Sequence, residues 1–242
     1  MKHLKLFFMA TVLACFFLSP SFADDITADI LTYDGNSKVV TAEGNIVIHA
    51  NQGAVITGQK GQYDFEDRSA WLEGNVRYEK EEMVITADKL HVYNDKTVHG
   101  TGSVYMNDGA GRRVLKGDDV IYNEATGFGK IRGNGYLASA DVSMQAPLIE
   151  GNMKQVEIVA SGGVTLTGES RQMTGYSDMA TYTRSGVNGS DGKLVLTGNA
   201  HIEQNGNSFD GPELVIWDAD KILETRGRST LIITNTSSGA GE

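Results

Sequence analysis

A glycine recurs about every 29 residues along this 242-residue chain, and the side chains around it alternate with a period of two. Positions two and four residues to either side of the glycine are almost all apolar or small, whereas the positions directly beside it carry no large apolar side chain. The repeated glycines are Gly44, Gly74, Gly102, Gly133, Gly162, Gly198 and Gly227. Such alternation is typical of β-strands with one buried and one solvated face, and its repetition predicts an elongated array of seven units.

The side chains that follow the repeated glycine by two and four residues are the candidate contacts of an apolar interior. The named candidates are Ile46, Ile48, Val76, Tyr78, Val104, Met106, Leu137, Val164, Leu166, Ile202 and Leu231. We expect the glycine itself on the buried face, where a missing Cβ permits a bend or a close approach between sheets. If each unit adds one strand to each of two sheets, the interior would be roughly 30 Å long.

Small inward residues leave two interpretations of this interior open. They are Ala42, Gly100, Gly129, Gly135 and Ala160. Small side chains leave room for a ligand between two sheets, but sheets that pack closely on each other also favour them. The sequence therefore predicts an apolar interior without deciding whether it is open or filled by side chains.

The repeats indicate one domain, predicted over residues 24–236 and followed by a flexible tail at 237–242. No stretch after residue 23 has an apolar period of 3.6, so helix is excluded as the main element. A turn-forming insertion at residues 184–192 accounts for the one longer gap between repeats. A second anchor precedes each glycine, as in Ala28-Asp29 with Tyr33.

The first 23 residues have the features of an export signal. Two lysines precede an apolar run over residues 6–18, and small residues lead to a predicted cleavage site after Ala23. We therefore expect a mature protein outside the cytoplasm. Two alternatives remain: an uncleaved anchor, although the run is shorter than the ~20 residues that span a bilayer, and lipidation at Cys15, although apolar residues follow that cysteine.

Charge and composition exclude several classes of function. The chain has 21 basic and 31 acidic residues and a formal charge of −10, which opposes a nucleic-acid partner bound through its phosphates. Its one cysteine lies in the predicted signal, so cysteine-based zinc sites and disulfides are not expected in the mature chain. The histidines lack metal-ligand spacing, and no catalytic motif occurs. We expect no metal, no cofactor and no catalytic residues.

Four segments repeat a related sequence pattern: residues 26–34 (ITADILTYD), 39–46 (VVTAEGNI), 84–90 (VITADKL) and 194–200 (LVLTGNA). These segments resemble the OstA-like repeats of the LptA family of lipopolysaccharide-transport proteins. The resemblance implies an all-β fold, an elongated open twisted β-jellyroll (β-taco) built from about seven OstA-like repeats. It also implies that acyl chains of lipopolysaccharide (lipid A) bind between the sheets of a periplasmic protein.

Partners follow from the same resemblance. Exposed terminal strands are templates for pairing with another sheet, so the family implies contacts with LptC-like inner-membrane and LptD-like outer-membrane proteins, and a possible head-to-tail homo-oligomer. The expected function is to shield acyl chains in an apolar trough and to bridge the two membranes.

Two other functions remain as alternatives. One is a different role in the same system, either a membrane-anchored LptC-like protein or an outer-membrane-receptor-like OstA domain. The other is an exported β-solenoid enzyme acting on polysaccharides, which would need clustered acids on one outward face. Adjacent acid pairs such as Glu81-Glu82 point to opposite faces of a strand, so they cannot flank one bond.

Overall fold

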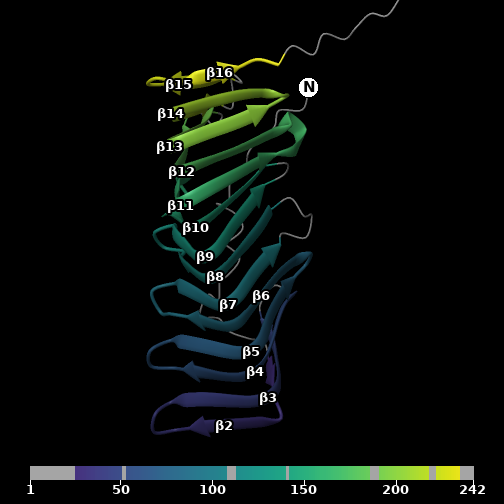
Figure 1. Ribbon diagram of the computed structural model, residues 1–242. Helices are drawn as coiled ribbons and strands as arrows, with labels where there is room; N and C mark the ends of the chain where they lie inside the picture. Colours follow the sequence, from purple (N-terminus) through teal and green to yellow (C-terminus); the bar gives the residue numbers. More distant parts are fainter. Residues whose placement is uncertain are drawn as a thin grey trace, which may run out of the picture.

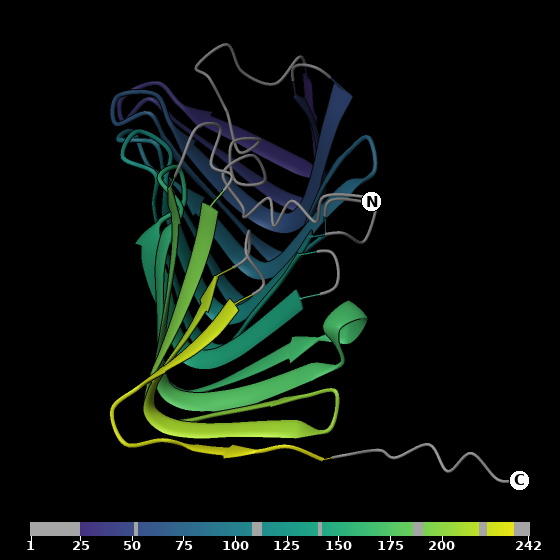
Figure 2. The same ribbon diagram turned by 90° about the horizontal axis from the view of Figure 1, so that it is seen from above.

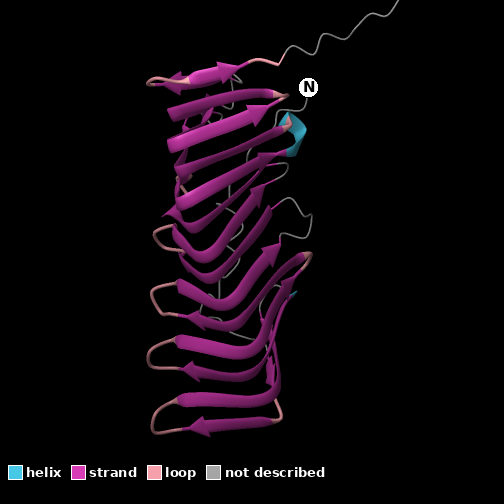
Figure 3. Cartoon of the chain, in the orientation of Figure 1, coloured by secondary structure: helices cyan, strands magenta, loops and turns pink. Residues whose placement is uncertain are grey.

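The computed structural model describes residues 25–50, 53–107, 113–139, 142–185, 191–217 and 222–234. The predicted signal peptide at 1–23, the tail at 237–242 and the centre of the predicted insertion therefore lie outside the described residues. Within the described ranges the chain is almost entirely β-strand, with one short 3₁₀ turn, η3, at Glu169–Arg171 (Figure 3). None of the helical segments in these ranges has the length and apolar character needed to cross a membrane.

Sixteen strands form one antiparallel sheet in which nearly every strand pairs with its neighbours in sequence (Figure 1). Their bounds are β1 Asp25–Thr27, β2 Ile30–Asp34, β3 Val39–Ala50, β4 Ala54–Asp64, β5 Ser69–Lys80, β6 Met83–Val92, β7 Thr97–Asn107, β8 Arg113–Asn123, β9 Phe128–Ser139, β10 Val142–Asn152, β11 Glu157–Gly168, β12 Met173–Ser185, β13 Asp191–Gln204, β14 Asn207–Trp217, β15 Ile222–Arg226 and β16 Thr230–Ile232. The short strands β1 and β2 both pair with β3 at one end, and β15 and β16 both pair with β14 at the other. The sheet is therefore long and open, and the all-β prediction is confirmed.

Each of the five central sequence repeats is a hairpin of two long strands, whereas the first and last repeats each contain a short strand, β2 and β15. The even-numbered strand comes first, and the odd-numbered strand that follows carries the repeated glycine; β4 and β5 are one such pair. The expectation that each unit adds one strand to each of two sheets was therefore wrong, because both strands of a hairpin lie in the same sheet. At about 4.8 Å per strand, the fourteen successive strands on the main path from β1 to β15 span about 65 Å, roughly twice the length expected from the sequence.

Every long strand bends near its middle, which folds the single sheet into two walls. Viewed along the stack, the bent strands enclose a V-shaped trough whose orientation turns gradually from the purple N-terminal end to the yellow C-terminal end (Figure 2). We call one of the two walls the "first wall": it contains the half of each even-numbered strand before the bend and the half of each odd-numbered strand after the bend. The remaining strand halves form the "second wall". The strand order from β1 to β15 is linear and does not close. No strand ladder therefore joins the two walls across the trough.

The bend arises from one extra residue in each odd strand. In β3 the inward residues Ala42 and Ile46 are four apart, whereas in β6 the inward residues Ala87 and Leu90 are three apart. The register shifts at this point in every pair of long strands, for example between Glu43 and Ile46 in β3. A bulge of this kind bends a strand and increases its local twist.

The repeated glycine forms this bulge in a left-handed backbone conformation. In six of the seven repeats the glycine and the residue after it both have positive φ: Gly44 and Asn45, Gly74 and Asn75, Gly102 and Ser103, Gly133 and Asn134, Gly162 and Gly163, Gly198 and Asn199. In the seventh, Gly227 alone has positive φ. Glycine and asparagine adopt this conformation at the lowest steric cost, which explains their pairing.

The glycine does not face the interior, contrary to the expectation from parity. A Cβ built on Gly133 would overlap the exposed carboxylate of Asp118 on the preceding strand. The same carboxylate accepts a hydrogen bond from Asn134 Nδ2 at 2.9 Å. The aspartates of the second anchors, such as Asp29, Asp88 and Asp118, therefore lie next to the repeated glycine on the outside of the bend.

Candidate functional site

The interior of the trough contains ten of the eleven residues named from the sequence. Nine are buried, with at most 6% of the side chain exposed: Ile46, Val76, Tyr78, Val104, Met106, Leu137, Val164, Leu166 and Ile202. Ile48 is partly buried and packs against the same core. Leu231 differs, because it lies on the terminal strand β16 and is 51% exposed. All of them follow a bulge, so they belong to the first wall alone.

The second wall supplies an equal share of the interior and was not among the candidates. Its largest fully buried side chains are Tyr122, Ile131, Ile149, Ile158, Leu196 and Leu214. Those on odd strands precede the glycine by two or four residues, so the alternation around the glycine does mark them. On even strands, the first inward residue of the second wall follows the last inward residue of the first wall by three residues. A search for alternation with a period of two does not detect such a step.

Large residues of the second wall pack across the bend onto glycines of the first wall. The position of a Cβ on Gly58 is filled by the side chain of Leu72, and that on Gly117 by Ile131. The Cβ position of Gly135 is occupied by the carbonyl oxygen of Ala146, with Ile131 3.4 Å away. Close packing therefore explains the inward glycines near the bend.

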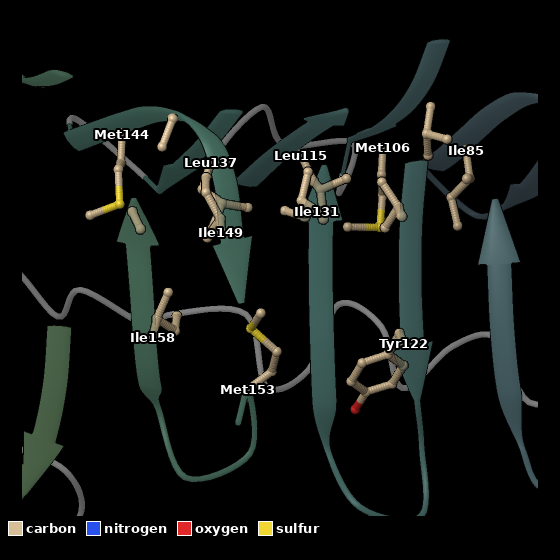
Figure 4. Packing of buried hydrophobic residues seen from close by; sticks show 14 of the residues in the cluster. Ile85, Met106, Leu115, Tyr122, Ile131, Leu137, Met144, Ile149, Met153 and Ile158 are labelled. Atoms are coloured by element: carbon tan, nitrogen blue, oxygen red, sulfur yellow. The ribbon is translucent and has the colours of Figure 1, made fainter. Parts of the chain in front are cut away.

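A small cavity of about 30 Å³ remains between the walls in the third and fourth units. Figure 4 shows four of the residues that line it: Ile85, Met106, Leu115 and Tyr122. Its lining comes from both walls: Ile85, Ala87, Leu90, Val98, Gly100, Val104, Met106, Leu115, Val120 and Tyr122. Ala87 and Gly100 are the smallest residues of this lining and contribute the least side-chain volume to it. Tyr122 carries the one side-chain polar group in this lining.

Charged groups lie on the outer face of the sheet. Among the described residues, the buried polar or charged ones are Ser139 and Ser177, and neither ionises in the accessible pH range. Outer-face ion pairs link neighbouring strands, as between Lys130 Nζ and Glu150 Oε2 at 2.5 Å and between Arg132 Nη1 and Asp119 Oδ1 at 3.3 Å. The described residues contain no group of acids and histidines that could hold a metal ion. The interior is thus suited to hydrocarbon.

Both ends of the sheet expose apolar side chains. At the N-terminal end Ile30, Leu31 and Tyr33 of β2 are 57%, 50% and 62% exposed. At the C-terminal end Ile222 of β15 and Ile232 of β16 are 51% and 56% exposed. These strands each pair with one neighbour, so one side of their backbone is available for another strand.

Comparison with known proteins places this architecture in a family. Residues 55–221 match the family model "LptA/(LptD N-terminal domain) LPS transport protein". A crystal structure of LptH from Pseudomonas aeruginosa, described as the LptA-homologous periplasmic component of the conserved lipopolysaccharide transport device, aligns with 50% of this chain and 93% of its own length at 15% identity, with a TM-score of 0.43. No curated protein matches the chain. Because the matched segment extends from β4 to beyond β14 and covers more than half of the chain, the protein belongs to the LptA/LptD N-terminal domain family of lipopolysaccharide-transport proteins.

Proposed function

We propose that the protein is a periplasmic carrier that holds the acyl chains of lipopolysaccharide between the two walls of its trough. The observation that carries this proposal is an apolar core that runs through every unit from Ala42 to Ile216, with charged side chains kept outside. Each methylene moved from water into such an interior contributes about 0.8 kcal/mol. A strongly acidic protein thereby binds an anionic glycolipid through its hydrocarbon rather than its phosphates.

The trough can widen without loss of backbone hydrogen bonds. The walls are joined through the bends of the strands and through side-chain contacts, whereas the ladders run along the stack. Acyl chains entering between the walls would replace one set of apolar contacts with another. The bulges, with glycine at each, are the flexible points about which the walls would separate.

The exposed ends support the second part of the proposal, a bridge between membranes. We propose that β2 at one end and β15 and β16 at the other pair with related sheets of LptC-like and LptD-like proteins, or with a second copy of this chain. Such strand addition combines backbone hydrogen bonds with side-chain contacts between exposed apolar residues. The two ends of one sheet would then extend a single trough.

A pair of neighbouring residues on β11 provides the test for lipid binding. Leu166 faces the interior and is 3% exposed, whereas Thr165 faces outward and is exposed. Binding of fluorescent lipopolysaccharide is measured for Leu166→Asp and Thr165→Asp. We expect a loss of affinity of tenfold or more for the inward change and less than twofold for the outward change, because only the inward carboxylate would lie against hydrocarbon.

A folding control separates lost binding from lost structure. Circular dichroism and urea unfolding of both variants identify any that do not fold. If Leu166→Asp is unfolded, Ile48→Asp replaces it, because Ile48 is only partly buried and tolerates a charge better. Equal loss of binding from both faces in folded variants would refute the proposal.

A further inference from the structure

Tyr122 carries a buried hydroxyl for which the fold supplies no hydrogen-bond partner. The residue lies near the end of β8 on the second wall, opposite Val98 of β7 and Gly129 of β9, and is 1% exposed. Its Oη is the one buried side-chain polar atom without a partner among the described residues. Figure 4 shows the ring of Tyr122 below Met106 and Leu115, with its hydroxyl turned away from both.

An orphaned hydroxyl destabilises the empty fold. A buried polar group that loses its hydrogen bond to water costs free energy, whereas phenylalanine would fill the same space without that cost. Burial also raises the pKa of Tyr122, with a smaller contribution from Glu124, so the group stays a neutral hydroxyl that can both donate and accept. The position of this oxygen indicates a partner that is absent from the protein itself.

Water is a poor candidate for that partner. The cavity that Tyr122 helps to line is large enough to hold a water molecule. A buried water needs two to four polar neighbours, but the other side chains of the lining are those of alanine, valine, leucine, isoleucine, methionine and glycine. A single hydroxyl does not hold a water in such surroundings.

We propose that the Tyr122 hydroxyl hydrogen-bonds an oxygen atom carried on a hydrocarbon chain bound between the walls. The ligand is thus an acyl chain with a hydroxyl or carbonyl oxygen along its length, rather than a plain alkyl chain. Its hydrocarbon would run past Met106 and Leu115 and along the Tyr122 ring, so that its oxygen meets the hydroxyl at the far end of the ring. The inference rests on the proposed function and adds chemical selectivity to it at one position of the trough.

The repeat provides a matched control for this position. Tyr182 of β12 stands in the corresponding place two units later: Tyr122 follows Val120 by two residues, and Tyr182 follows Ala180 by two. Tyr182 is also buried, at 3% exposure, but its hydroxyl is not orphaned. Tyr182→Phe therefore removes a hydroxyl from another buried tyrosine of the same wall.

Titration with tetradecanoic acid and its monohydroxy derivatives tests the proposal. The derivatives place one hydroxyl at successive carbons, and calorimetry gives the affinity of the wild type, Tyr122→Phe and Tyr182→Phe. We expect the wild type to bind at least one hydroxylated isomer about tenfold more tightly than the plain acid. Tyr122→Phe should lose that preference while binding the plain acid as before, and Tyr182→Phe should retain it.

The outcomes distinguish this inference from the proposed function. If the wild type binds the acids without preferring any hydroxylated isomer, or if the preference survives in Tyr122→Phe, the inference is refuted and lipid binding stands. If it binds neither the acids nor lipopolysaccharide, both are refuted. Urea unfolding without lipid gives a second readout: Tyr122→Phe should be at least as stable as the wild type, and a clear loss of stability would show that the hydroxyl already has a partner.

Discussion

Replacement of Gly133 by alanine should reveal what the bulge contributes to the fold. The glycine lies at φ 68°, where an L-residue costs about 1–2 kcal/mol. Its new Cβ would also lie 3.0 Å from Asp118 Cβ and would overlap the carboxylate, displacing the hydrogen bond from Asn134. Loss of that bond adds about 1 kcal/mol. We expect Gly133→Ala to lower the free energy of unfolding by about 2–3 kcal/mol in urea titration.

A double-mutant cycle separates the two causes. Asp118→Ala alone should cost about 1 kcal/mol, because it removes the same hydrogen bond. In the double variant the overlap is gone and only the backbone strain and one lost bond remain, so the total should stay near 2–3 kcal/mol instead of rising to the sum of the single changes. Full additivity would refute the overlap, and a neutral Gly133→Ala would refute the reasoning about the bulge itself.

Two further predictions concern pH and assembly. Burial lowers the pKa of His91, helped by the charges of Lys89 and His99. Because the folded state binds fewer protons than the unfolded chain, the contribution of His91 to stability is complete above pH 6.5 and is lost as the pH falls through the lower folded pKa. His91→Gln should reduce the difference in urea midpoint between pH 7 and pH 5, and identical pH slopes in both proteins would contradict this. Separately, sedimentation should show concentration-dependent end-to-end assembly. It should weaken in Leu31→Lys, which places a charge at the inward side of the exposed end, but not in the outward Thr32→Lys. A strictly monomeric wild type at high concentration would rule out self-assembly.

Alternation around the repeated glycine was sufficient to predict strands and the inward residues after it. Residues such as Ile46 and Leu166 are buried, as the alternation counted from the glycine indicates. The bulge does not disturb this count, because two residues in the bulge replace one and the inward positions stay an even number apart. The same count of alternating positions placed the glycine on the buried face, which is wrong. Positive φ turns the position of its missing Cβ toward side chains of the preceding strand, which are carboxylates in four of the seven repeats, and a flat strand pattern does not reveal this.

The remaining differences depend on neighbours that the pattern does not contain. Ala87 and Leu90 are both inward but three residues apart, so the period of two read around the glycine does not continue through the bend of β6 and the other even strands. Leu231 has the same sequence environment as its counterparts, yet it is exposed because few strands cover the end of a finite array. The cavity beside Tyr122 depends on how side chains from several strands fill space together.

The nearly consecutive strand order has a consequence for the size of the molecule. Since each hairpin pairs with the hairpins just before and after it in the chain, its contacts do not depend on how many others there are. One hairpin more or less would change the length by about 10 Å and leave the cross-section as it is. Duplication of the gene segment that encodes a hairpin can therefore lengthen the sheet without changing the residues that line the trough. Because the strand pairing is local, folding can also begin at any hairpin and add the neighbouring hairpins one after another.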